Sequence, residues 1–227
     1  MRCNLFFRGL LDYRIAAGAV LCVWASFAHA DYSARDFFMA APAATFHTEV
    51  DMTEPEKAFI IKNKFQPLAD SDYSKCLDWG VPEESPHTMQ LKSCFDSSIR
   101  IRVFNSIPGP IVVAVGVSMG QSSELDMYTV SLSDHTITNI PRDQVASIGI
   151  EKITENDFLS EESKFSESEA LPAEIFMVND GSIQAMVSSW MDPRWENKII
   201  TYDVSFVWDG VKFKKVRTKQ EALPDRH

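Results

Sequence analysis

The chain has 227 residues, of which 45% are hydrophobic and 24% are charged, and its formal net charge at pH 7 is −10. This acidic balance argues against nucleic acid as a partner, because binding it depends on a basic face that neutralises phosphates. A cationic protein would suit the negative field better, although an acidic surface is as often only a means of staying in solution.

The first thirty residues have the pattern of a secretory signal peptide. Arginines at positions 2, 8 and 14 precede an apolar stretch at residues 15–27, and Ala28-His29-Ala30 follows. A membrane-spanning helix needs roughly 20 apolar residues, so this stretch is too short for a retained anchor. We therefore expect cleavage after Ala30 and a periplasmic or secreted mature chain of 197 residues, whose net charge is −12 because three arginines and one aspartate leave with the signal.

Two cysteines, Cys76 and Cys94, would remain in the mature chain. An even pair in an exported protein predicts a disulfide bond, since such compartments are oxidising. Closing a loop of this length contributes about 3 kcal/mol in the chain-entropy model. The spacing is far from Cys-x-x-Cys, so we expect a structural bridge and not a redox site.

Residues 31–88 predict short helices followed by a loop that the disulfide tethers. Residues 33–40 predict a first helix with an aromatic face packed on a sheet. Residues 53–56, Thr-Glu-Pro-Glu, have the capping-box pattern with Pro in the first turn, and they predict a second helix that ends near residues 63–64. Residues 66–86 are polar and turn-forming, which indicates the loop.

Strand signals begin at residue 89 and persist almost to the end of the chain, so residues 89–227 are predicted to form a β domain. Residues 89–94 and 99–103 predict a hairpin with one wet face. Residues 111–115 are apolar at every position, which is typical of a strand covered on both faces. Further strands are predicted near residues 125–133, 136–140 and 145–150.

The strand region contains an internal repeat. The pattern Tyr-x-Val-Ser-apolar occurs at residues 128–132 and again at residues 202–206, an offset of 74. Flanking residues agree at similar offsets. We therefore predict two related antiparallel units, the first at residues 99–140 and the second at residues 174–216.

The two repeats are joined by an acidic linker at residues 155–170, with five Glu, one Asp and one Lys. Its composition predicts a mobile, solvated linker with two or three apolar contacts, and in the alternative Phe158, Leu159 and Phe165 pin a short helix to the sheet. The predicted fold is mainly β: an antiparallel sandwich or incomplete barrel built from two related four-to-five-strand meanders, with short N-terminal helices. Two propeller-like blades are an alternative, whose exposed edges would need a partner chain.

The second repeat includes a predicted tight hairpin. Asp209-Gly210 is typical of a two-residue type I′ turn. That turn would place Trp208 opposite Val211 and Phe206 opposite Phe213, with a bulge in the strand after Phe213.

Residues 116–120, Gly-Val-Ser-Met-Gly, match the G-x-S-x-G pattern after an apolar strand. They resemble the serine turn of α/β hydrolases, which implies Ser118 as a nucleophile. That turn must lead from a strand into a helix, but residues 121–124 lead into another strand. The histidines after the motif are His135 and the terminal His227. We therefore interpret the motif as coincidental and predict no catalytic residue.

No metal site or cofactor is predicted, because the histidines are scattered and no phosphate-binding glycine loop is present. The loop Trp190–Asn197 is the candidate binding surface: it is two residues longer than its counterpart in the first repeat and contains residue types common in binding hot spots. The candidate binding residues are Trp190, Asp192, Arg194 and Trp195. In the alternative interpretation, Trp190 caps the core and Trp195 covers an edge.

No motif is specific enough to indicate a family. Charge and the expected compartment favour an exported, non-enzymatic binding protein that docks a protein or a cell-envelope component through its acidic surface and the Trp190–Asn197 loop. The alternatives are an inhibitor or immunity protein for a cationic wall-degrading enzyme, a structural envelope protein, and a serine hydrolase that uses Ser118.

Overall fold

The computed structural model describes residues 32–46, 52–65, 79–92, 97–106, 109–119, 122–178, 181–187 and 192–220. The chain divides into two units, Met1–Tyr32 and Ser33–His227, and the fold below belongs to the second. The predicted signal peptide lies outside the described residues, and so do Cys76 and Cys94 with the predicted bridge between them.

Two short helices precede the strands, α2 at Ala34–Ala40 and α3 at Glu54–Lys62, with a 3-10 turn η1 at Ala43–Thr45 between them. Both helices begin with a capping box, in which an N-cap hydroxyl and an acidic side chain three residues later exchange hydrogen bonds with the backbone. Both helices were predicted, and the predicted starts are correct. Among the described residues, no helix is long and apolar enough to cross a membrane.

Lys57, in α3, links the two helices by hydrogen bonds. Its Nζ atom donates a hydrogen bond of 3.1 Å to the carbonyl oxygen of Met39 and another to the carbonyl oxygen of Ala41, at the C-terminal end of α2. The last carbonyl groups of a helix lack hydrogen-bond partners within the helix. The Lys57 ammonium supplies such a partner at the C-terminal end of α2. Burial lowers the pKa of Lys57.

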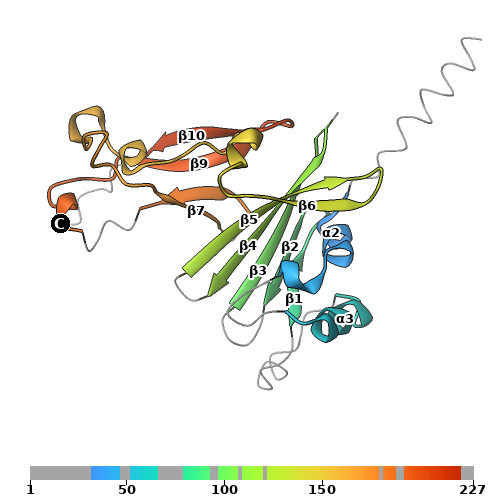
Figure 1. Cartoon of the computed structure of the whole chain (residues 1–227). Coiled ribbons are helices and arrows are strands. Elements are labelled where there is room, and N and C mark those ends of the chain that lie inside the picture. Colours follow the sequence, from blue (N-terminus) through green and yellow to red (C-terminus); the bar gives the residue numbers. More distant parts are fainter. Residues whose placement is uncertain are drawn as a thin grey trace, which may run out of the picture. The chain divides into compact units, whose positions relative to one another are not determined.

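Six strands form an antiparallel sheet in which each strand lies beside its neighbours in the chain (Figure 1). They are β1 Gly80–Glu84, β2 Thr88–Lys92, β3 Ser97–Phe104, β4 Ile111–Met119, β5 Ser122–Ser131 and β6 Thr136–Ile140. The predicted β2–β3 hairpin is confirmed, with Met89 opposite Ile101. The prediction of a loop over residues 66–86 is wrong for β1. Pro82 argues against a strand at this position in the sequence. Pro is tolerated here because β1 is an edge strand.

Four further strands form a second antiparallel sheet in the order β10-β9-β8-β7. They are β7 Glu174–Met177, β8 Ile183–Met186, β9 Tyr202–Trp208 and β10 Phe213–Lys219. This meander has the same connectivity as β3 to β6 in the first sheet. The predicted mainly β fold, with two related antiparallel meanders and short N-terminal helices, is confirmed. Among the described strands both sheets are open, since each has two edge strands.

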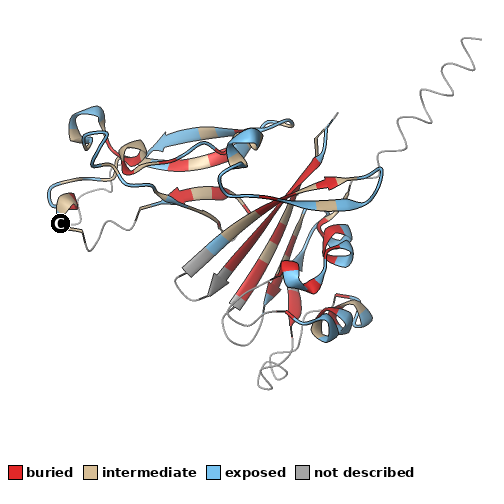
Figure 2. Ribbon diagram, in the orientation of Figure 1, coloured by how far each residue is buried: buried red, intermediate tan, exposed pale blue. Residues whose placement is uncertain are grey.

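The central strand β4 of the first sheet is buried along most of its length, on both of its faces (Figure 2). The ring of Phe37 in α2 lies 5.6 Å from the ring of Tyr128 in β5, so α2 covers one face. The other face contributes Val112, Ala114 and Met127 to a core shared with the second sheet. Burial on both faces explains why the start of β4 is apolar at every position.

Gly116 lets the second sheet approach β4 closely. A Cβ atom placed on Gly116 would lie 2.8 Å from the Cβ atom of Met177 in β7, which is closer than real side chains come. A glycine in the interior of a strand often marks such a close approach. The first glycine of the G-x-S-x-G pattern therefore has a packing role.

The connector between β6 and β7, residues 141–173, also packs against the sheets. The predicted strand at residues 145–150 is wrong, because Val145–Ile148 form the 3-10 turn η3, which ends at Gly149 with a positive φ of 89°. A Cβ atom on Gly149 would overlap the carbonyl oxygen of Phe213 in β10. Glycine at this position therefore permits the connector to lie against the second sheet.

The acidic linker packs on the core through two of the apolar residues, Phe158 and Leu159, that the sequence singles out in it. It contains two 3-10 turns, η4 Glu155–Phe158 and η5 Glu161–Ser163. Phe158 and Leu159 are buried, and so is the carboxylate residue Glu155. Buried apolar residues and the Glu155 carboxylate therefore both hold the first part of the linker in place.

The β9–β10 hairpin differs from its predicted register. Phe213 lies opposite Trp208, and Lys215 lies opposite Phe206, with an uninterrupted ladder and no bulge. The connection has four residues instead of two, because the Asp209 carboxylate accepts the N–H groups of Val211 and Lys212 at 3.0 and 2.9 Å. This aspartate organises a wider turn than Asp-Gly alone predicts.

Candidate functional site

Three of the predicted binding residues lie together in and beside a 3-10 turn, η6 at Pro193–Trp195. Asp192 is the N-cap, and its carboxylate accepts the backbone N–H of Arg194 at 2.9 Å. The fourth candidate, Trp190, lies outside the described residues. The structure thus brings Asp192, Arg194 and Trp195 into one cluster.

That cluster is bound to the acidic linker through Glu155, whose side chain is 8% exposed. The carboxylate accepts hydrogen bonds from the indole nitrogen of Trp195 at 3.0 Å and from both terminal nitrogens of Arg194 at 3.0 and 3.1 Å. It also accepts the backbone N–H of Leu171 at 3.0 Å. A buried carboxylate with four donors holds the loop to the linker.

Aromatic contacts and further hydrogen bonds complete the cluster. The ring of Phe165 lies 5.4 Å from that of Trp195, and the Arg194 guanidinium lies 5.1 Å above Phe165. Hydrogen bonds to Asp192 and to Glu155 raise the pKa of Arg194, and the same guanidinium lowers the pKa of Asp192. Trp195 is only 7% exposed. Its packing and hydrogen bond hold the loop in place, so it offers little surface to a partner.

The serine motif lies in a strand hairpin. The backbone of Ser118, in β4, is paired with Ser123 in β5, so the chain runs from strand to strand where a nucleophile elbow needs a helix. Gly120, the last residue of the motif, lies outside the described residues. Within the described part of the chain, no group of three or more His, Cys, Asp or Glu side chains is placed to hold a metal ion.

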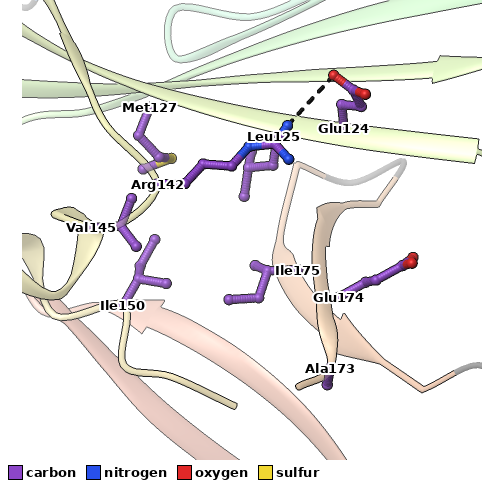
Figure 3. A pocket seen from close by; sticks show the side chains of 9 residues that line it. All are labelled: Glu124, Leu125, Met127, Arg142, Val145, Ile150, Ala173, Glu174 and Ile175. Atoms are coloured by element: carbon purple, nitrogen blue, oxygen red, sulfur yellow. Dashed lines mark hydrogen bonds and ion pairs between the residues drawn. The ribbon is translucent and has the colours of Figure 1, made fainter. Parts of the chain in front are cut away.

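A pocket of ≈ 510 Å³ lies between β5, the connector and β7 (Figure 3). Its volume falls within the roughly 300–1,000 Å³ of small-molecule sites. It is lined by Glu124, Leu125, Met127, Arg142, Val145, Ile150, Ala173, Glu174 and Ile175. Six of these nine side chains are apolar, so the pocket suits an apolar group.

The alternation of side chains along β5 directs Leu125 and Met127 into the pocket. Leu125 and Met127 lie two residues apart on β5 and therefore share the face that looks toward the second sheet. Ile175 of β7 points toward Ile150 and Val145 of the connector across the space (Figure 3). Leu125, Val145 and Ile175 are partly buried side chains packed against the shared core. The pocket is thus an opening into that core.

Charged residues occupy the mouth of the pocket. Nη2 of Arg142 lies 3.5 Å from a carboxylate oxygen of Glu124, and these side chains are 71% and 65% exposed. The Arg142 side chain extends past Leu125 toward Glu124, while the Glu174 carboxylate points away from Ile175 (Figure 3). Of the three charged side chains that line the pocket, Arg142 is therefore the one whose charged group lies beside the apolar lining.

A second, smaller cavity of ≈ 110 Å³ lies at the end of β7, beside Met177. It includes Arg100, Gln90 and Glu83 from the first sheet, with Met177 and Gly181 from the second. Its polar lining and small volume suit water better than an organic ligand. The larger pocket is therefore the candidate functional site.

Sequence reasoning did not find this pocket, because its three walls are far apart in the chain. The sequence predicts a strand at residues 145–150, and a strand there indicates no site. No family model, curated protein or solved structure matches the chain.

Proposed function

We propose that this chain is an exported, non-enzymatic binding protein that holds the apolar part of a small amphipathic ligand in the pocket between its sheets. The observation that carries the proposal is the ≈ 510 Å³ pocket, whose apolar side chains continue into the shared core. Ligand sites of this kind combine an apolar lining with a few polar groups that fix orientation. Arg142 and Glu124 are such groups at the mouth.

The loop at residues 192–197 supports the proposal less well than the pocket does. The Arg194 guanidinium already binds two carboxylates, and the Trp195 indole nitrogen already has an acceptor. A partner would have to break these contacts before it could use either side chain. We therefore propose that the pocket, and not this loop, is the binding surface. The proposed ligand is an amphipathic envelope component.

Binding of the neutral fluorescent probe N-phenyl-1-naphthylamine tests the proposal. The protein should bind the probe with increased emission, because its rings fit an apolar pocket of this volume. Ala173→Phe places a ring where a small side chain lines the pocket, and we expect it to weaken probe binding at least tenfold.

Val211→Phe is the matched control, because it adds the same ring at a hairpin position that is 67% exposed. It should leave probe affinity within about twofold of the unmodified protein, as expected of a surface change. Thermal unfolding of both variants checks that they are folded. Equal probe binding by the folded Ala173→Phe variant and the unmodified protein would show that the pocket is not the site.

A further inference from the structure

Arg142 is placed to meet the polar end of a ligand that enters the pocket. It lies two residues after β6 ends at Ile140, and the connector that begins there supplies Val145 and Ile150 to the lining. Its guanidinium lies beside Leu125, at the boundary between the apolar lining and solvent (Figure 3). A ligand with its apolar part in the pocket would therefore present its head group to Arg142.

The ion pair between Arg142 and Glu124 can be exchanged at small cost. The N–O distance of 3.5 Å is long for a hydrogen bond, and both side chains are mostly exposed. Exposed pairs of this kind contribute little to stability, because water screens both charges. A second carboxylate can therefore replace Glu124 without leaving a buried charge unpaired.

Guanidinium geometry favours a carboxylate as that head group. Arginine presents its donors in a planar fork, which matches the two oxygens of a carboxylate and allows two parallel hydrogen bonds. We propose that the ligand is an alkyl carboxylate, whose chain fills the pocket and whose carboxylate binds Arg142 in place of Glu124. This inference rests on the proposed function and names its ligand class.

The two acidic residues at the mouth should then differ in effect. Glu124 competes with the ligand for Arg142, because its carboxylate is the one paired with the guanidinium. The carboxylate of Glu174 points away from the pocket (Figure 3). Removing the charge of Glu124 should strengthen carboxylate binding more than removing the charge of Glu174, although each substitution changes the net charge equally.

Displacement of N-phenyl-1-naphthylamine by three compounds of equal chain length provides the test. Dodecanoate, dodecanol and dodecylamine are titrated below their micelle concentrations at mildly alkaline pH, where the carboxylate is ionised. We expect dodecanoate to bind about tenfold more tightly than dodecanol, as for hydrogen bonds to a charged group. Dodecylamine should bind no more tightly than dodecanol.

Substitutions at the mouth identify the group responsible. Arg142→Gln should bring dodecanoate and dodecanol within about twofold of each other, and Arg142→Lys should keep only part of the difference, because a single ammonium lacks the planar fork. Glu124→Gln should raise dodecanoate affinity roughly two- to fivefold, and Glu174→Gln should have a smaller effect.

The outcomes separate this inference from the proposed function. If dodecanol displaces the probe but dodecanoate binds no more tightly, the pocket is a ligand site and the carboxylate assignment is wrong. Tighter binding of dodecylamine, or a dodecanoate preference unchanged in Arg142→Gln, also overturns the assignment. If none of the three compounds displaces the probe, the proposed function itself fails.

Discussion

The indole nitrogen of Trp195 donates a 3.0 Å hydrogen bond to the carboxylate of Glu155, forty residues earlier in the chain. The same carboxylate binds the guanidinium of Arg194. One buried acidic residue thus joins the acidic linker to the loop before β9. Arg194 and Trp195 are residue types common at binding surfaces, but here they hold the loop before β9 to the acidic linker.

Glu155→Ala should therefore destabilise the protein by about 3 kcal/mol, because it removes a buried carboxylate and leaves the N–H groups of Trp195 and Leu171 without their acceptor. Urea unfolding measures the change. Glu161→Ala is the control, since Glu161 belongs to the same linker but its side chain is 78% exposed. Equal effects of the two substitutions would show that Glu155 does not hold the loop.

Gly116→Ala should destabilise the protein by about 1–3 kcal/mol, because the added methyl group overlaps Met177 and the sheets must move apart. Chemical denaturation of Gly116→Ala, Met177→Gly and the double variant forms a double-mutant cycle. The double variant should lose less stability than the sum of the single variants, because Met177→Gly removes the Cβ atom that the new methyl group crowds. Strict additivity would contradict the close approach of β7 to β4.

Asp209 predicts a pH dependence of stability. The Lys214 ammonium, with the N–H groups of Lys212 and Val211, holds the pKa of the Asp209 carboxyl well below its usual range. A carboxyl whose pKa is lower in the folded state stabilises the fold above its unfolded pKa of about 4, and this contribution declines as the pH falls below that value. The stability difference between the unmodified protein and Asp209→Asn should therefore shrink in acid.

Urea unfolding at neutral pH and at a series of acidic pH values measures this difference. Asp143→Asn serves as the control, because Asp143 is an exposed acid in a different loop. A difference between Asp209→Asn and the unmodified protein that stays constant down to strong acid would show that the Asp209 carboxylate charge does not stabilise the turn.

An alkanol series measures how much chain the pocket accepts. From hexanol to dodecanol, affinity should rise about fourfold for each methylene, since each buried CH₂ contributes ~0.8 kcal/mol and ~1.4 kcal/mol is a factor of ten. The rise should stop when the pocket is full. In Ala173→Phe the plateau should come at a shorter chain, and an unchanged plateau would place the chain elsewhere.

A fluorophosphonate probe tests the serine hydrolase alternative. We expect no labelling of Ser118, because the strand hairpin at β4–β5 provides no helix behind the serine to direct backbone N–H groups at an oxyanion. Labelling detected on a gel and lost in Ser118→Ala would instead establish a reactive serine and overturn the non-enzymatic proposal.

Features set by local residue chemistry could be predicted from the sequence. The Thr53 capping box defines the start of α3, and the alternation in β2 and β3 gives their pairing. The repeated pattern at residues 128–132 and 202–206 predicts two related meanders, because equivalent strands need equivalent apolar positions. These signals lie within short stretches of chain.

Features that depend on distant contacts could not be predicted in the same way. An Arg and a Trp in a loop look alike in the sequence whether they face a partner or a buried carboxylate such as Glu155. The register of the β9–β10 hairpin depends on which N–H groups the Asp209 side chain accepts. The pocket needs β5, the connector and β7 to be placed together, and none of these segments is a site alone.

Gly149 touches no part of the pocket, yet the neighbouring residue, Ile150, forms one of its walls. Any side chain at position 149 would meet the backbone of Phe213 and push the connector away from β10. Position 149 thus affects the volume available to a ligand, although the residue there does not line the pocket. Engineering a wider or narrower binding space could begin at this glycine and leave every contacting side chain unchanged.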